Sequence, residues 1–446
     1  EISACLVGSE MCIRDRYTPL SSNLYKSNRA KFMDAISQGG LAVFNSNDIY
    51  PISADSTMPF QQHRDIFYLT GIDQEESILL LFPDAKNPNH REVLFVKKTN
   101  NHIAVWEGAK LSQKEATNIS GIKTVLWTDD FKLLFNQLTK EAKAIYFNTN
   151  EHYRANVETQ TREDRFIKWA KKKYPTHQHE KSNFILQRLR SIKNKEEIGQ
   201  IQQAINITEK GFRRVLNFVK PGVWEYEIEA EFANEFIKNR SKGFAYSPII
   251  ASGQNNNILH YIHNNSKCQS GDLILIDVGA EYGNYSSDMT RTIPVSGKFT
   301  PRQRAVYDAV QKIGEEAMQL LVPGTLIKEY NNEVGKIMTS ALIDLGLLNK
   351  KDSKIKDKKN PAYKKYFMHG TSHHLGLDTH DYGLIEEPIE PNMVLSVEPG
   401  IYIPEEGFGI RIEDNILVKN EDGPLNLMKN IPKDADQIEK LMSKRD

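Results

Sequence analysis

The stretch Gly271–Thr292 reads GDLILIDVGAEYGNYSSDMTRT. Its run of apolar β-formers, Leu273–Ile276, ends on Asp277, and a second carboxylate follows two glycines later at Asp288. This pattern predicts a strand, a glycine-containing hairpin and a returning strand, with the two carboxylates on opposite arms. A buried carboxylate without a partner is costly, and two that face each other repel. The stretch therefore predicts a site for cations.

Three later segments carry side chains of the same kind. They are a His-rich turn (369–376, HGTSHHLG), a short strand (395–400, LSVEPG) and another strand (409–414, GIRIED). With the hairpin they supply one histidine and four carboxylates, namely Asp277, Asp288, His373, Glu398 and Glu413. Hard oxygen ligands with one imidazole suit Mn²⁺, Co²⁺, Fe²⁺ or Zn²⁺ at two adjacent positions. The residues alone thus argue for a dinuclear metal hydrolase.

The order of these motifs resembles that of a known family. The motifs follow one another in the order D-x10-D, H-G-x-x-H, E-P-G and R-I-E-D. This order is similar to that of the metal site in the pita-bread metallopeptidases, which include methionine aminopeptidase, aminopeptidase P and prolidase. The match is best to the proline-specific branch and covers nearly all of residues 25–440. Each motif alone is weak, but four in this order do not readily arise by chance.

Length and composition fit an ordinary soluble protein of more than one domain. The 446 residues predict two or three domains. Lys+Arg and Asp+Glu both number 58, so the net charge of zero gives no support for a nucleic-acid partner. No apolar run reaches the roughly 18 residues needed to cross a membrane. We expect an N-terminal α/β domain over 17–180 and a catalytic domain over 181–446.

Residues 1–16 look foreign to the protein. The segment CLVGSEMCIRDR, Cys5–Arg16, back-translates onto a transposase-based sequencing adapter, so we hypothesise a read-assembly artefact. A failed signal peptide is the alternative, but charged residues interrupt its short apolar stretch. Re-amplification of the gene tests this, because a natural transcript with this segment would contradict the hypothesis. Without it, Cys268 is the only cysteine, which allows no disulfide and fits a reducing cytoplasm.

The N-terminal region alternates between helical and strand patterns. Ala54–Ser56 and Phe60–Gly71 resemble the N-terminal domain of aminopeptidase P. Trp106 stands where that family has an exposed aromatic that reaches a neighbouring subunit, which implies a homodimer or homotetramer; half-buried packing is the alternative. The predicted elements are a helix over 28–38, strands over 41–44, 65–69, 77–82 and 92–96, and a helix near 131–138.

The C-terminal region contains an internal repeat of a helix-Pro-Gly-helix pattern. A long helix, 193–218, ends near Pro221-Gly222 and a second helix covers 225–239; about a hundred residues later a helix ends at Pro323-Gly324 and another runs to Leu345. Strands follow each helix pair. The resemblance implies the pita-bread layout, an α/β (α+β) fold in which pseudo-repeated helix pairs cover a curved antiparallel sheet and the ligands lie where the two halves meet. The lysine-rich segments 168–173 and 350–365 are interpreted as solvated surface.

The resemblance also assigns roles to the ligands. Asp288 and Glu413 would bridge two metals, Asp277 would hold one metal with both oxygens, and His373 and Glu398 would complete the other. Metals about 3.5–4 Å apart lower the pKa of a shared water and so supply hydroxide as the nucleophile. No G-x-S-x-G motif occurs, which disfavours covalent catalysis.

Further residues match the family outside the ligand set. His380 would stabilise the oxyanion, His260 would gate or orient the substrate, and His369 would line the same cavity. Arg411 and Tyr246 would orient Asp277 from outside the ligand shell. His374 departs from the family, where an aromatic such as tryptophan is usual, and this departure bears on the wall that receives proline.

The resemblance implies an Xaa-Pro aminopeptidase, which releases the first residue of a peptide whose second residue is proline. Prolidase, which cuts Xaa-Pro dipeptides, is the near alternative. A metal-free binding protein on the same fold and the creatine-hydrolysing relative are disfavoured, because all five ligands are present. We expect two divalent ions, Mn²⁺ before Co²⁺, Fe²⁺ or Zn²⁺, and a cytoplasmic location. The native metal, the physiological peptide and the oligomeric state stay open.

Overall fold

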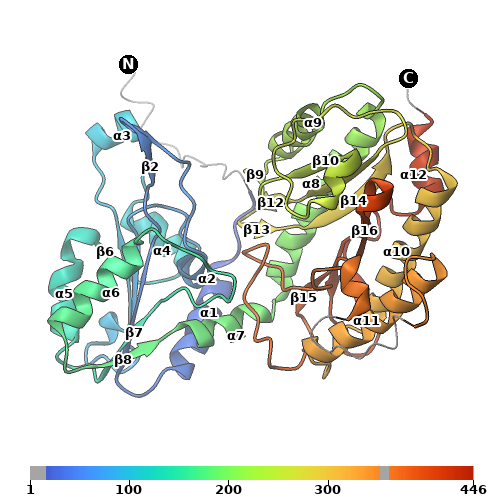
Figure 1. Ribbon diagram of the computed structural model, residues 1–446. Coiled ribbons are helices and arrows are strands. Elements are labelled where there is room, and N and C mark those ends of the chain that lie inside the picture. Colours follow the sequence, from blue (N-terminus) through green and yellow to red (C-terminus); the bar gives the residue numbers. More distant parts are fainter. Residues whose placement is uncertain (1–16, 352–360, 445–446) are drawn as a thin grey trace. The chain divides into compact units, whose positions relative to one another are not determined.

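The computed structural model describes residues 17–351 and 361–444, which form two compact units (Figure 1). One unit contains residues 20–192 and 382–384, and the other contains 17–19, 193–381 and the chain from 385 onward. The segment predicted to be an artefact, 1–16, lies outside the described residues, as does most of the lysine-rich segment 350–365. Within the described ranges, every helix is too short or too polar to cross a bilayer.

The N-terminal unit is built on a mixed six-stranded sheet in the order β6-β5-β4-β1-β7-β8. β4 runs antiparallel to both neighbours, and the remaining pairs are parallel. The central strands are apolar on both faces because helices cover both. The strands are β1 (Gly40–Asn45), β4 (Ile78–Leu81), β5 (Glu92–Val96), β6 (Thr124–Trp127), β7 (Ala144–Phe147) and β8 (Gln178–Lys181), with a small separate pair, β2 (Pro51–Ser53) and β3 (Ser56–Thr57).

Aromatic side chains fill the core on one face of this sheet. Phe131 and Phe135 stack with ring centroids 5.4 Å apart, and Phe166 packs against both. They lie on α5 and α6, which explains why the pattern at 131–138 reads as an amphipathic helix. The helices of the unit are α1 (Ser22–Ala35), α2 (Arg64–Thr70), α3 (Asn101–Glu107), α4 (Gln113–Ser120), α5 (Phe131–Leu138), α6 (Arg162–Lys173) and α7 (Asn183–Ser191).

Two expectations for this unit need correction, and one of the two alternatives for Trp106 does not hold. The run 65–69, predicted as a strand, is the helix α2: His63 caps its start, and Gly71 ends it at φ 72°. Short apolar runs do not separate buried helix from strand. The first helix begins at Ser22 rather than at residue 28 and ends at Ala35. Trp106 is 77% exposed, so half-buried packing is wrong for this chain.

The C-terminal unit contains two helix pairs, each packed on its own strands. α8 packs on α9 and against the strands at 280–282 and 285–286, whereas α10 packs on α11 and against the strands at 394–397, 400–403 and 408–411. Figure 1 draws the first pair in green and the second in orange. The helices are α8 (Lys195–Phe218), α9 (Glu225–Lys238), α10 (Pro301–Gln319), α11 (Ile327–Asp344) and α12 (Ala435–Met442).

Among the described residues of this unit, all strand pairs are antiparallel. A bridge between Thr290 and Glu413 joins the strands that follow the first helix pair to those that follow the second. The strands are β9 (Gly243–Phe244), β10 (Ile249–Ser252), β11 (Leu273–Val278), β12 (Ala280–Tyr282), β13 (Tyr285–Ser286), β14 (Met289–Pro294), β15 (Val394–Val397), β16 (Gly400–Ile403), β17 (Phe408–Arg411), β18 (Asp414–Leu417) and β19 (Leu425–Asn426).

The predicted hairpin at 271–292 contains a second, smaller hairpin that was not expected. β11 pairs with β14, and the smaller hairpin β12–β13 projects between them. Its turn residues Gly283 and Asn284 have φ of 59° and 68°, the left-handed pair that a tight hairpin turn requires. The result keeps Asp277 and Asp288 beside the junction of the two halves.

Candidate metal centre

The first half of the C-terminal unit supplies two carboxylates. Asp277 lies near the end of β11 opposite Thr290, and Asp288 immediately precedes β14. The hydroxyl of Tyr246 lies 2.6 Å from Oδ1 of Asp277 and 2.6 Å from Oδ1 of Asp288. One hydroxyl carries one hydrogen, so Tyr246 donates to one carboxylate at a time and cannot remove the repulsion between the two.

Arg411 holds the other oxygen of Asp277. Its Nη2 donates to Oδ2 of Asp277 at 2.5 Å, and both side chains are largely buried. Its Nε donates to Oγ1 of Thr290 at 3.1 Å, and its Nη1 to the hydroxyl of Tyr402 at 2.8 Å. Three hydrogen bonds therefore fix the guanidinium behind Asp277, with Tyr246 on the opposite side of the carboxylate.

The second half supplies His373, Glu398 and Glu413. The His-rich turn runs along β15, since the amide of Ser396 donates to the carbonyl of His373 at 2.9 Å. The amide of Glu398 likewise donates to the carbonyl of Thr371 at 2.9 Å. Glu413 lies between β17 and β18, where its amide donates to the carbonyl of Thr290 at 3.0 Å. Backbone pairing thus brings the motifs together from three distant segments.

The ring of His373 is oriented as a ligand requires. Its Nδ1 lies 3.0 Å from the carbonyl oxygen of His374, which only accepts, so Nδ1 carries the hydrogen. The lone pair of Nε2 then faces the carboxylates, 3.3 Å from Oδ2 of Asp288. Nε2 also lies 3.8 Å from oxygens of Glu398 and Glu413.

The electrostatics of the cluster favour bound cations. Burial, reinforced by Asp288, raises the pKa of Asp277 against the opposing charge of Arg411. Burial also raises the pKa of Glu398 to about 7 and that of Glu413 well above its ordinary value. Oε1 of Glu413 is buried and has no hydrogen-bond partner within the described residues. Donor atoms of Asp288, His373 and Glu413 lie within 4.8 Å of one another, so the residues present fit a divalent metal.

Two further histidines lie beside this cluster, and a third, His260, is exposed on the chain between β10 and β11. The rings of His380 and His373 meet edge to face with centroids 4.5 Å apart. His369 lies 3.6 Å from Oε2 of Glu398. Burial, followed by the charge of Arg411, lowers the pKa of His369 to about 3.

His374, the departure from the family pattern, is buried near a second ion pair. Lys193 Nζ lies 3.1 Å from Oδ2 of Asp381, and both side chains are 1% exposed. Burial and the charge of Lys193 lower the pKa of His374 to about 3, whereas Asp381 raises it. His374 therefore lies in the electrostatic surroundings of this ion pair.

Thr290 and Tyr402 take part in the surroundings of the site without having been predicted. Thr290 accepts from Arg411 and donates to Oε2 of Glu413 at 2.8 Å. Its position two residues after Asp288, on the same face of the strand, was an available signal. Tyr402 stands between two isoleucines in a strand, where an aromatic reads simply as a β-former.

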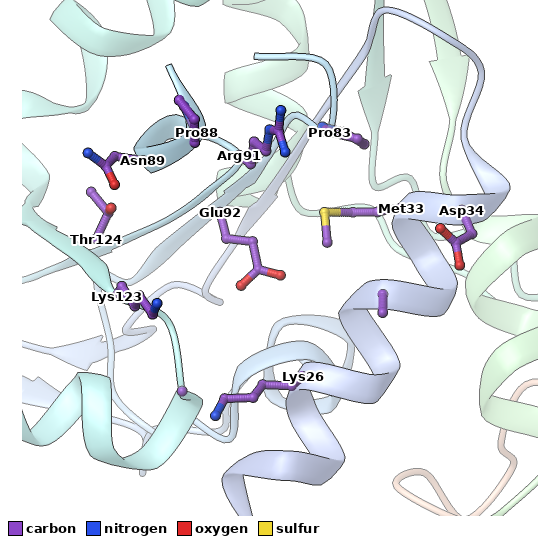
Figure 2. A pocket seen from close by; sticks show the side chains of 12 residues that line it. Lys26, Met33, Asp34, Pro83, Pro88, Asn89, Arg91, Glu92, Lys123 and Thr124 are labelled. Carbon is purple, nitrogen blue, oxygen red and sulfur yellow. The ribbon is translucent and has the colours of Figure 1, made fainter. Parts of the chain in front are cut away.

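A groove of about 520 Å³ lies in the N-terminal unit, between α1 and the starts of β5 and β6. Figure 2 shows Glu92 in its middle, with Lys26 and Lys123 to one side. Oε2 of Glu92 already pairs with Arg29 at 3.0 Å. The lining of the groove combines both signs of charge and contains neither histidine nor cysteine.

Two related halves that meet at four carboxylates and a histidine define a metal-dependent hydrolase of the pita-bread type. The sequence profile of metallopeptidase family M24 matches residues 199–420, and that of the aminopeptidase P N-terminal domain matches residues 25–146. The chain is 35% identical to an Xaa-Pro aminopeptidase of Escherichia coli over 95% of this chain and 98% of the relative.

Solved structures of aminopeptidase P resemble this chain over nearly its whole length. Zn-substituted E. coli aminopeptidase P in complex with product has a TM-score of 0.85, and the same enzyme with the inhibitor Pro-Leu has 0.86. Each is 32% identical, and the match covers 96% of this chain and 99% of the other. The chain belongs to the Xaa-Pro aminopeptidases, and is a metalloaminopeptidase that uses divalent metal. The family and the fold class expected from the motifs are confirmed.

Proposed function

We propose that Asp277, Asp288, His373, Glu398 and Glu413 together hold two divalent ions, with Asp288 and Glu413 shared between them. The observation that carries this is the buried Oε1 of Glu413, which has no partner among the described residues and lies 3.8 Å from Nε2 of His373. When bound, divalent cations supply Lewis acidity and activate water for attack on the peptide carbonyl.

The surrounding residues have separate proposed tasks. Arg411 and Tyr246 position Asp277, because they engage its two oxygens from opposite sides. His380, beside the ring of His373, stabilises the oxyanion that forms on the carbonyl. His260 and His369 contact and orient the peptide. This assignment requires no serine or cysteine nucleophile, and the buried Cys268 is not needed.

The substrate is a peptide with proline in the second position. The bond before proline lacks an N–H and has a fixed φ, so it resists peptidases that bind extended backbone. Prolidase activity is the competing assignment, because its chemistry is the same and only the treatment of the substrate's C-terminus differs.

Hydrolysis of an Arg-Pro-Pro tripeptide and of Xaa-Pro dipeptides, after chelation and with Mn²⁺ restored, tests the proposal. We expect metal-dependent release of the first residue of the tripeptide. Cleavage of dipeptides alone would favour prolidase. A folded protein that binds two metals but cleaves neither substrate would contradict the proline preference and leave the metal centre intact.

Manganese, a homo-oligomer and a cytoplasmic location complete the proposal. A ligand set rich in carboxylates with a single imidazole favours Mn²⁺ among the candidates. Trp106, 77% exposed on α3, supports contact with a further subunit. The free, buried Cys268 is compatible with a reducing compartment. Metal analysis of protein purified without added metal, light scattering and cell fractionation test these points.

A further inference from the structure

A fully buried carboxylate lies outside the metal centre. Glu225 is the first residue of α9 and is 0% exposed. Its Oε1 accepts hydrogen bonds from the amide and the hydroxyl of Ser252, both at 2.7 Å, and from Nδ2 of Asn255 at 3.2 Å. Its Oε2 accepts from the hydroxyl of Tyr261 and the amide of Ser266, both at 2.8 Å.

All five donors belong to one segment, 252–266, and they are neutral groups. Ser252 and Ser266 are the two ends of this segment, so a single carboxylate ties both ends. The backbone adds to the attachment, because the amide of Glu225 donates to the carbonyl of Ser266 at 3.0 Å. A buried carboxylate is stable only when such donors surround it, so the segment and Glu225 depend on each other.

The segment carries His260. His260 is exposed, as are its neighbours Ile258 and Ile262, at 54% and 55%. Tyr261 is instead buried at 7%, with its hydroxyl on Glu225. Adjacent residues thus face opposite ways, and the bond from Tyr261 to Glu225 fixes the direction in which His260 points.

The ring of Tyr261 also reaches the surroundings of the metal centre. It packs in one hydrophobic cluster with Tyr402, Ile249 and Leu275. The hydroxyl of Tyr402 accepts from Arg411 and lies 2.8 Å from Nε2 of His369. Tyr261, which is bonded to Glu225, thus shares a hydrophobic cluster with Tyr402, whose hydroxyl meets side chains beside the metal ligands.

We infer that Glu225 is a positioning residue: its carboxylate holds the segment 252–266 so that His260 faces the substrate. The inference rests on the role proposed for His260. The hydrogen bonds to the Glu225 carboxylate all come from the segment, so Glu225 acts through the segment.

Glu225→Gln is the sharpest perturbation, because the shape is kept while one acceptor oxygen becomes an NH₂ group that faces donors. Glu227→Gln is a matched control. Glu227 lies two residues along the same helix, but its carboxylate accepts from the backbone amide of Trp224 at 2.7 Å rather than from the segment. Tyr261→Phe removes a single bond to Glu225 and is the milder second variant should Glu225→Gln fold poorly.

The experiment is a double-mutant cycle on the full-length, metal-loaded enzyme, with Glu225→Gln and His260→Ala made singly and together. Metal content is measured for every variant. We expect Glu225→Gln to lower kcat/KM on the order of 10- to 100-fold with metal retained, and Glu227→Gln to leave it within about twofold. The double variant should be no slower than His260→Ala alone. Tyr261→Phe should give a smaller loss that likewise disappears in the His260→Ala background.

Multiplicative losses in the double variant, or an unchanged rate for Glu225→Gln, would overturn the inference. A wild-type rate for His260→Ala would instead overturn the role of His260 and the inference with it, while metal binding and proline specificity would stand. Hydrogen exchange gives a readout without catalysis. Glu225→Gln should speed exchange within 252–266 specifically, and equal acceleration throughout the unit would indicate a general loss of stability and contradict the inference.

Discussion

Oγ1 of Thr290 donates to Oε2 of Glu413 at 2.8 Å, across 123 positions of sequence, and leaves Oε1 of Glu413 pointing at Nε2 of His373. The same hydroxyl accepts from Nε of Arg411, whose Nη2 holds Asp277. One threonine therefore orients a carboxylate from each half of the domain. Because its oxygen both donates and accepts, no apolar residue can replace it.

Thr290→Val should weaken the centre while the side-chain shape is kept. Nε of Arg411 and Oε2 of Glu413 would both lose a buried partner, which costs about 1–3 kcal/mol for each unsatisfied group. We expect lower thermal stability and weaker metal binding by calorimetry. Thr290→Ser, which retains the hydroxyl, is the control and should bind metal close to wild type. Equal affinities for the two variants would contradict this role of the hydroxyl.

Glu413→Gln should abolish tight metal binding without unfolding the protein. The amide oxygen can still accept from Thr290, but the anionic ligand atom is lost. We expect kcat/KM to fall by at least about 100-fold and the metal content measured by mass spectrometry to drop. The metal-free variant should be more stable than the metal-free wild type by about 1 kcal/mol, because one of four repelling buried carboxylates is gone. Full metal content in the variant would refute the ligand assignment.

Chelation should lower the melting temperature of the wild-type enzyme, and Mn²⁺ should restore it. A metal at a hundredfold excess over its Kd stabilises the folded state by about 2.7 kcal/mol per site. Scanning calorimetry with and without chelator measures the shift. Glu413→Gln is the control, since its melting temperature should respond much less to chelator. If neither chelator nor Mn²⁺ changed the melting temperature of the wild-type enzyme, the result would argue against a metal centre here.

Glu163, in the N-terminal unit, predicts a pH dependence of stability independent of the metal. Its Oε2 accepts from the amide and Nδ2 of Asn45 at 3.0 and 2.9 Å, yet burial raises its pKa from an ordinary 4.5 to about 8. Between these pH values the folded chain keeps a proton that the unfolded chain has lost. Its contribution to stability is therefore present below pH 4.5 and is lost as the pH rises through about 8.

Glu163→Gln should remove this dependence. Denaturant unfolding at pH 5 and pH 8 measures the difference between variant and wild type, which should grow in favour of the variant by about 1 kcal/mol or more. Glu180→Gln, at an exposed position of the same unit, is the control for a change of charge. A constant difference across this pH range would show that Glu163 titrates with its ordinary pKa.

Much of the architecture was predictable from local patterns. The apolar run Leu273–Ile276 is β11, the pattern at 131–138 is α5, and Pro-Gly separates the helices of both pairs. These elements follow from periodicity and turn residues, which act over a few neighbours. The helix at 65–69 was missed because five buried residues bounded by His63 and Gly71 satisfy a short strand equally well.

The sequence by itself determined the chemistry: which side chains could hold a metal, in what order, and in which family. Only the tertiary structure decided the geometry. The register that sets Asp277 opposite Thr290, and the bridge from Thr290 to Glu413, bring together side chains more than a hundred residues apart. The surroundings of Glu225 could not be predicted from the sequence either, since a glutamate at a helix start is typical of an ordinary surface residue. Its importance appears only when five donors of a distant segment surround it, because hydrogen bonds depend on distances that folding alone sets.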